Sequence, residues 1–183
     1  MTAAIKPFHA MTIGAAAFRM QEAGRSILHM EYGQPSAQPP AAIRDAARVM
    51  LNDHVKGYWE SAALKEAIAG SYQSAYGVSI DPGRIVLTCG ASPALALALM
   101  TMFRPGDKIA MARPGYVAHR NCVLGLHMEP VEVACGADSG YQLTAQKVKD
   151  LTDPIDGLII ASPANPTGSI IPQAELSEIV AYC

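Results

Sequence analysis

Three loops of this sequence carry residues that could bind a charged, planar ligand, and the most distinctive loop contains Asn165. Residues 162–168 read Ser-Pro-Ala-Asn-Pro-Thr-Gly and follow the apolar run 157–161. A short apolar run predicts a buried strand, and Pro and Gly predict a turn after it. The turn therefore places the Asn165 amide at the carboxyl end of a strand, where open α/β sheets bind ligands. This amide can donate a hydrogen bond to a phenolate oxygen, and a purely turn-forming role is the alternative.

The second loop, residues 88–95, joins an expected strand over 85–88 to an almost wholly apolar helix over 92–102. Ser92 is expected to be the N-cap of this helix and Pro93 its first residue, where a missing N–H has no cost.

The same loop predicts an anion site. The amides of Ala91, Ser92 and Ala94 would lie at the positive end of the helix dipole, and Gly90 would let the backbone approach the anion closely. The alternative is an ordinary, well-capped core helix. The spacing is neither GxGxxG nor a Walker loop, so it does not indicate a dinucleotide or a nucleoside triphosphate.

The third loop ends at Tyr116, just beyond an expected strand over 109–112. A tyrosine ring there can stack on a planar ligand, and a half-buried loop tyrosine is the alternative. His119 follows closely, but no carboxylate partner stands at a useful spacing, so we expect a histidine at the surface or packed against its helix.

Apolar runs of helical and strand length alternate along the chain, which predicts an α/β fold of three layers, α/β/α, with a mostly parallel sheet. The alternation is still under way where the sequence stops, so we expect the sheet to be incomplete at the C-terminus. The expected helices cover 11–23, 41–51, 62–76, 92–102, 117–124, 144–151 and 173–182, and the expected strands cover 26–32, 85–88, 109–112, 127–133 and 158–161.

Composition excludes several classes of function. The 183 residues are 50% hydrophobic and 16% charged, with a formal net charge of −2. No basic run indicates nucleic acid and no apolar run is long enough for a membrane span. The N-terminus lacks the apolar core of a secretory signal, so we expect a cytoplasmic protein. The four cysteines show no metal-ligand spacing, which predicts reduced, mostly buried thiols and no metal site.

In their order along the chain, the three loops resemble the N-terminal part of the class I/II aminotransferases, which are pyridoxal-phosphate (PLP) enzymes of fold type I. The resemblance runs from about residue 27 to residue 182. It implies that Gly90, Ala91 and Ser92 hold the cofactor phosphate, that Tyr116 stacks on the pyridine ring and that Asn165 donates to the ring phenolate.

Two earlier segments extend the resemblance. Residues 31–35, Glu-Tyr-Gly-Gln-Pro, are similar to the family segment in which a glycine amide approaches the substrate carboxylate. This implies substrate binding by Gly33, and the alternative is a glycine needed only for backbone conformation. Residues 57–58, Gly-Tyr, are similar to a segment that reaches the neighbouring subunit of a homodimer, which implies that Tyr58 binds the partner's cofactor phosphate.

The family's catalytic groups are expected beyond Cys183. These are the Schiff-base lysine, the aspartate on the pyridinium nitrogen and the substrate arginine, so no catalytic residue is expected within the chain. The resemblance assigns residues 1–40 to an N-terminal arm associated with the small domain and 41–183 to a partial PLP-binding large domain. We therefore expect the N-terminal part of an enzyme that uses an amino acid and a 2-oxo acid as substrates and is inactive alone.

Other functions stay open. PLP-dependent lyases and decarboxylases of the same fold share these motifs. A truncated, non-catalytic remnant could keep a phosphate-binding or dimerisation role. A nicotinamide-dependent oxidoreductase is disfavoured, because the dinucleotide glycines are absent. We also expect the chain alone to be poorly soluble, since an incomplete sheet exposes an edge and an apolar face.

Overall fold

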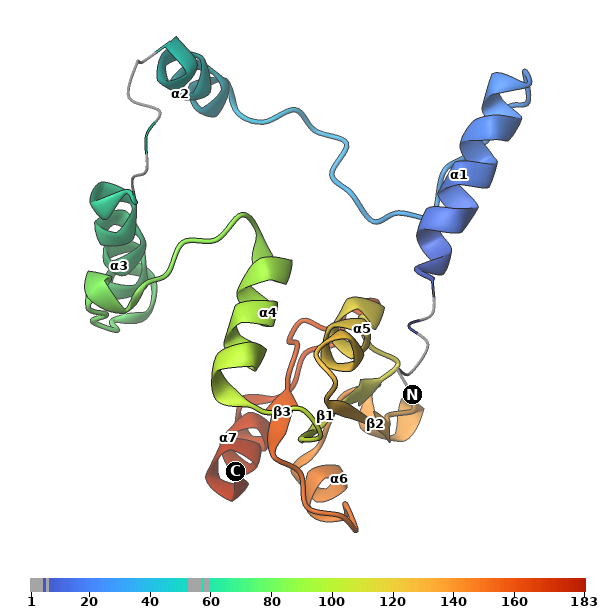
Figure 1. Ribbon diagram of the computed structural model, residues 1–183, viewed down its shortest axis with the longest axis vertical. Coiled ribbons are helices and arrows are strands. Elements are labelled where there is room, and N and C mark those ends of the chain that lie inside the picture. The colour runs from blue at the N-terminus through green and yellow to red at the C-terminus, as the bar shows by residue number, and fades with distance from the viewer. Residues whose placement is uncertain (1–4, 6, 53–56, 58–59) are drawn as a thin grey trace. The chain divides into compact units, whose positions relative to one another are not determined.

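The computed structural model describes residues 5, 7–52, 57 and 60–183. Their contacts divide the chain into two compact units (Figure 1). One unit joins residues 90–183 to the described residues up to Ile13, and the other spans residues 14–89. The candidate site lies in the first unit, and each unit is described by itself.

The first unit is built on three parallel strands, β1 (Lys108–Arg113), β2 (Glu129–Ala134) and β3 (Gly157–Ile159), in the order β2-β1-β3. In the register, Ile109 lies opposite Pro130 on β2 and opposite Gly157 on β3. All three strands therefore end at the same edge of the sheet, as the predicted parallel arrangement requires.

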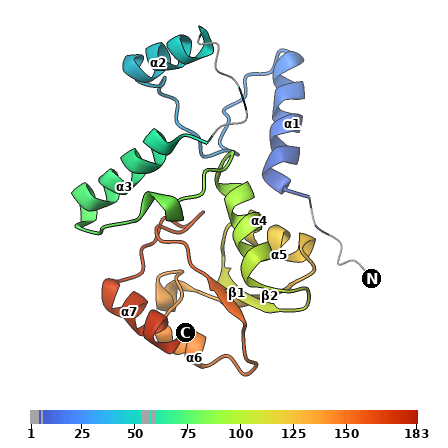
Figure 2. The same ribbon diagram turned by 60° about the vertical axis from the view of Figure 1, so that its left-hand side comes forward.

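Helices cover both faces of this sheet, as Figures 1 and 2 show. They are α4 (Ala91–Met102), α5 (Val117–Gly125), α6 (Ala145–Lys149) and α7 (Gln173–Tyr182). Alternate residues of β1 point to opposite faces. Ile109 and Met111 pack in a cluster with residues of α4 and α5, whereas Ala110 packs with residues of α6 and α7. The predicted three-layer α/β/α fold is confirmed.

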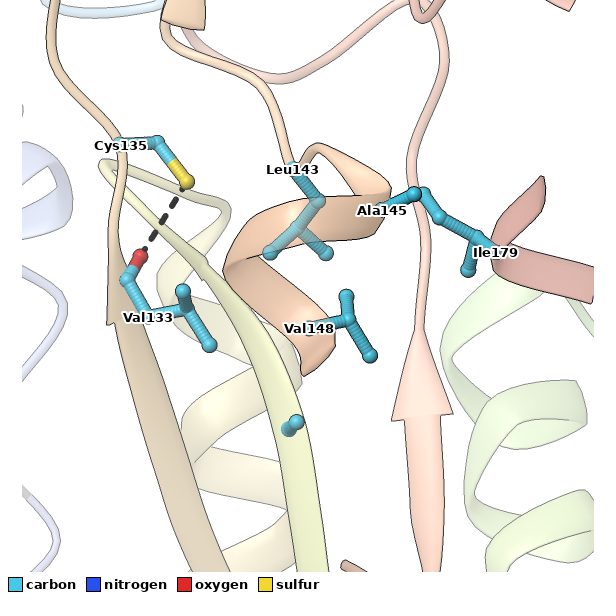
Figure 3. Packing of buried hydrophobic residues seen from close by; sticks show 7 residues of the cluster. Val133, Cys135, Leu143, Ala145, Val148 and Ile179 are labelled. Atoms are coloured by element: carbon cyan, nitrogen blue, oxygen red, sulfur yellow. Dashed lines mark hydrogen bonds between the residues drawn. The ribbon is translucent and has the colours of Figure 1, made fainter. Parts of the chain in front are cut away.

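The core on the α6 and α7 face contains Val148 and Ile179, both 1% exposed (Figure 3). Cys135 lies beside them, and its Sγ donates to the carbonyl of Val133 at 3.3 Å. Burial raises the pKa of the Cys135 thiol, which keeps it protonated. The prediction of mostly buried thiols holds for Cys135 but is wrong for Cys89 and Cys183, which are exposed.

The second unit contains most of α1 (His9–Glu22), together with α2 (Ala41–Asn52), α3 (Ala62–Tyr76) and a single 3₁₀ turn at Pro82–Arg84. The bounds of α3 are those predicted, because both ends are capped. The Ser61 hydroxyl accepts from the amide of Leu64 at 3.2 Å, and Gly77 ends the helix at a φ of 68°.

Two predicted strands are wrong, since neither segment has a neighbouring strand in the described part of the chain. Residues 26–32 form a loop in which Leu28 is 83% exposed and Met30 81% exposed. Residues 85–88 are not a strand either, although Ile85 has extended backbone angles. The strand predicted over 127–133 begins only at Glu129, because His127 has a φ of 61°, which a strand cannot accommodate.

None of the helices in the described ranges combines the length and the apolar character that crossing a bilayer requires. Within the same residues, no three His, Cys, Asp or Glu side chains gather closely enough to hold a metal ion.

Candidate functional site

A small cavity lies at the carboxyl edge of the sheet. The loops that follow all three strands line it: Tyr116 follows β1, Gln142 follows β2 and Asn165 follows β3. This is the edge at which parallel α/β sheets bind ligands. Tyr116 and Asn165, which the sequence singled out independently, therefore lie at one cavity.

Aromatic neighbours fix the ring of Tyr116. Phe8 contacts it edge-on, with ring centroids 6.0 Å apart and planes at 76°. His119 does the same from α5, at 5.4 Å and 89°. Edge-to-face contacts of this kind are favourable because the positive ring edge meets the negative ring face. The turn before Tyr116 requires Gly115, because a Cβ there would overlap the carbonyl oxygen of Ala112.

His119 lines the same cavity and is partly buried. Burial lowers the pKa of its imidazole, since the charged form loses hydration. The ring is therefore neutral at pH 7. The sequence predicts a histidine at the surface or packed against its helix; in the structure His119 is partly buried and its ring packs against that of Tyr116.

The loop that carries Asn165 is closed on itself by hydrogen bonds. The amide of Ala164 donates to the carbonyl of Ser169 at 2.9 Å, and the amide of Gly168 donates to the carbonyl of Ala164 at 2.7 Å. Gly168 has a φ of 71°, which favours glycine. At the base of the loop, the Ser162 hydroxyl accepts from the amide of Ile171 at 3.0 Å. Asn165 is exposed, so its amide is accessible to a ligand.

Gln142 also belongs to this site, and sequence reasoning missed it. Its side chain is buried, with 4% of the residue exposed. Its Nε2 donates to the carbonyl of Ala161 at 3.0 Å and to that of Ser169 at 2.7 Å, one on each side of the Asn165 loop. No local signal marks this residue, because its partners lie 19 and 27 positions along the chain.

The N-terminus of α4 differs from the prediction. Gly90, with φ 110° and ψ 172°, is the N-cap, and the helix begins at Ala91 without a side-chain cap hydrogen bond. Ser92 is therefore the second helical residue and not the cap. The reason is that Gly90 adopts backbone angles that residues with a Cβ avoid, so the helix begins one residue before Ser92. The Ser92 hydroxyl is thus not used for capping. These residues are not part of the cavity lining.

The two remaining site predictions lie elsewhere. Gly33 belongs to the second unit. Its φ lies outside the left-handed range and an added Cβ would meet nothing within 4 Å, so neither conformation nor local packing there requires a glycine. Tyr58 lies outside the described residues.

Comparisons with a family model and with known relatives all identify the same family. The family model described as aminotransferase class I and II matches residues 26–183. A valine–pyruvate aminotransferase from Mycobacterium tuberculosis is 38% identical, over 100% of this chain and 48% of the relative. A probable aspartate/prephenate aminotransferase from Aquifex aeolicus is 30% identical, over 98% of this chain and 46% of the relative.

Solved structures agree. A crystal structure of an aminotransferase from Mycobacterium tuberculosis matches with a TM-score of 0.95 at 38% identity, covering 100% of this chain and 48% of that one. Aspartate aminotransferase from Thermus thermophilus with maleate matches with a TM-score of 0.90 at 25% identity, covering 97% and 47%. The chain therefore spans about half the length of the relatives it matches.

Proposed function

Because this chain belongs to the class I and II aminotransferases, we propose that it supplies the N-terminal part of an enzyme that transfers an amino group between an amino acid and a 2-oxo acid. The observation that carries the proposal is the meeting of Tyr116 and Asn165 at one cavity on the carboxyl edge of the sheet. Pyridoxal phosphate is the proposed cofactor.

The residues present fit this cofactor. The N-cap of α4 is Gly90, which has no side chain, and the positive end of the helix together with the Ser92 hydroxyl suits a dianionic phosphate. Gly90 has no atom within 4 Å of an added Cβ, which leaves open space beside that terminus. The ring of Tyr116 suits a planar pyridine. When bound, pyridoxal phosphate supplies an electron sink for the substrate carbanion.

Each residue has a separate task in this proposal. Asn165 donates to the ring phenolate and so favours its ionised form. Tyr116 stacks on the ring, while Phe8 and His119 hold the plane of Tyr116. His119 adds no charge there, because burial lowers its pKa. The amide of Gly33 binds the substrate carboxylate.

The proposal extends to the whole protein. The lysine, aspartate and arginine that the family uses come from outside these 183 residues, so the chain alone does not transaminate. The complete enzyme is a cytoplasmic homodimer in which Tyr58 binds the cofactor phosphate of the partner subunit. Residues 1–40 form an arm associated with the small domain, and residues 41–183 belong to the large domain. Valine and pyruvate are the first substrates to test, because the 38% identical relative is named for them.

Absorbance spectroscopy of the native gene product tests the cofactor site. We expect a visible band from bound pyridoxal phosphate that shifts with pH. Asn165→Ala should raise the pKa of this chromophore, because the phenolate loses a hydrogen-bond donor. Asn52→Ala, at the exposed end of α2, is the matched control and should change nothing. A protein without the band, or an unchanged pKa in Asn165→Ala, would contradict the assignment.

A further inference from the structure

We propose that Gln142 is a positioning residue that sets the place of Asn165 by clamping both ends of its loop. This inference rests on the proposed function, since Asn165 matters through its hydrogen bond to the cofactor. Gln142 itself would touch neither the cofactor nor the substrate through its amide nitrogen, because that nitrogen is already occupied by the protein.

The geometry of the clamp is specific. Ala161 stands just before the loop and Ser169 just after it, and the Gln142 Nε2 donates to both carbonyls, at 3.0 and 2.7 Å. Both partners are acceptors only, so the NH₂ end of the amide must face them. One side chain therefore fixes the distance between the two ends of residues 162–168.

The clamp also reaches the residue next to Asn165. The carbonyl of Ser169 accepts a second hydrogen bond, from the amide of Ala164 at 2.9 Å. A carbonyl oxygen has two lone pairs, and these two donors fill them. The contacts thus run from Gln142 to Ser169, then to Ala164, which directly precedes Asn165. A shift of the Gln142 amide would move the backbone that aims the Asn165 side chain.

Burial makes the amide hard to replace. Among the described residues, Gln142 is the only polar residue that is buried, with 4% of its surface exposed. The next residue, Leu143, is buried too. Leucine at this position would remove the Gln142 donor from both carbonyls, which is costly away from water, and the Ser169 carbonyl would keep only the amide of Ala164. Ionised glutamate would point an acceptor at two acceptors, whereas protonated glutamate could donate to one of them.

The first test is hydrogen exchange by mass spectrometry on the native gene product. In Gln142→Leu, we expect the amides of residues 162–171 to exchange at least roughly tenfold faster, because two hydrogen bonds are lost. Gln146→Leu is the control, since Gln146 is exposed and its Nε2 donates to Asp150, four residues along the chain, at 2.6 Å. Unchanged exchange in Gln142→Leu would overturn the clamp.

If Gln142→Leu does not fold, Gln142→Glu keeps the inference testable. Protection of residues 162–171 should then recover as pH falls and the buried carboxyl becomes protonated. Protection that is independent of pH in Gln142→Glu, at any level, would overturn the clamp.

The second test separates positioning from mere stability. The chromophore pKa of bound pyridoxal phosphate should rise in Gln142→Leu, as in Asn165→Ala, and the double variant should rise no further than Asn165→Ala alone. A chromophore pKa that is unchanged in Gln142→Leu, or two shifts that simply add, would overturn the positioning role. Absence of any bound cofactor would contradict the proposed function, and hydrogen exchange would still decide whether Gln142 clamps the loop.

Discussion

Single residues around the cavity divide into those that would touch a ligand and those that hold the first group in place. Asn165 and Tyr116 belong to the first group. The second group has three members. Gln142 holds the Asn165 loop by two hydrogen bonds, and Gly115 permits the close turn before Tyr116. His119 holds the ring of Tyr116 by an edge-to-face contact. Residues of the second group act through geometry, so substituting them should alter the site without removing any ligand contact.

Gly33 offers a clean test at this scale, because an added Cβ would meet nothing within 4 Å. We expect Gly33→Ala to leave stability unchanged and to raise KM for the amino-acid substrate of the native gene product, since the methyl would intrude only on a bound substrate. Gly70→Ala is the matched control: it is exposed within α3, and alanine should stabilise the helix by about 0.5–1 kcal/mol without a change in KM. An unchanged KM in Gly33→Ala would reject its substrate role.

His119 should make stability depend on pH. Its folded pKa is lowered by burial from an ordinary value of 6.5, so the unfolded chain binds more protons just below that pH. Its contribution is therefore complete above about pH 6.5 and is lost as pH falls toward the lower, folded pKa. Urea unfolding of the native gene product between pH 5 and 8 measures this. His119→Phe keeps a ring edge toward Tyr116 and should flatten the slope, whereas an equal slope in the variant would exclude His119 as the cause.

At the scale of elements, the helix termini decide what their residues can do. Thr144 caps α6, because its hydroxyl accepts from the amide of Lys147 at 3.2 Å. Ser92 does not cap α4, because Gly90 takes the cap position. A hydroxyl side chain near a helix N-terminus can therefore cap the helix or remain available for a ligand, and at Ser92 the conformation of the neighbouring Gly90 makes the difference.

This contrast predicts opposite effects of two similar substitutions. Thr144→Ala should destabilise the protein by about 1 kcal/mol, as loss of an N-cap does, and should leave cofactor affinity unchanged. Ser92→Ala should leave stability unchanged and weaken binding of pyridoxal phosphate, because the phosphate loses a donor. Urea unfolding and a cofactor titration of the native gene product measure the two effects. A loss of stability in Ser92→Ala comparable to that in Thr144→Ala would show that Ser92 is a cap after all.

Local sequence signals predicted the elements that have local causes. The helix over 62–76 has its predicted bounds because Ser61 and Gly77 cap it. The strands predicted over 26–32 and 85–88 fail because a strand also needs a neighbouring strand to pair with, and the described residues offer none beside either segment. The Gly90 cap was missed because its φ of 110° is not visible in the residue type alone.

The candidate site followed the same rule. Tyr116 and Asn165 could be found because each stands in a turn after an apolar run, and both line the cavity. Gln142 could not be found, because its two carbonyl partners are brought to it by the folding of β3 and the loop beyond it. Contacts that depend on distant parts of the chain leave no mark near the residue that makes them.

At the scale of the whole molecule, the first unit has an apolar groove. It has a volume of about 720 Å³ and is lined by residues of α4, β3 and α7, including Leu99, Ile159 and Ile179. In the described residues, β3 pairs only with β1, so its other edge is unpaired there. In the described residues, the second unit buries little besides Gly14 and Ala69. Apolar surface of this kind favours association with another polypeptide segment.

Limited proteolysis should report this uneven burial. In the 183-residue polypeptide, trypsin should cut first at Arg44 and Arg48 in α2, where no described residue is buried, and should spare residues 108–134. The native gene product should resist cleavage at the same two sites if it has the length of its relatives, because the further chain would cover α2. Equal resistance of the two polypeptides would contradict the view that α2 needs a partner.

The most direct test of the proposed function is to follow the nitrogen atom. The native gene product is incubated with ¹⁵N-labelled amino acids, beginning with valine, and with pyruvate, and the products are identified by mass spectrometry. Aminotransfer predicts that ¹⁵N appears in alanine and that an equal amount of the 2-oxo acid of the donor forms. Three results would contradict an aminotransferase. Release of ¹⁵N-ammonia in place of labelled alanine would favour a lyase, and release of carbon dioxide would favour a decarboxylase. No product with any donor would favour a non-catalytic remnant.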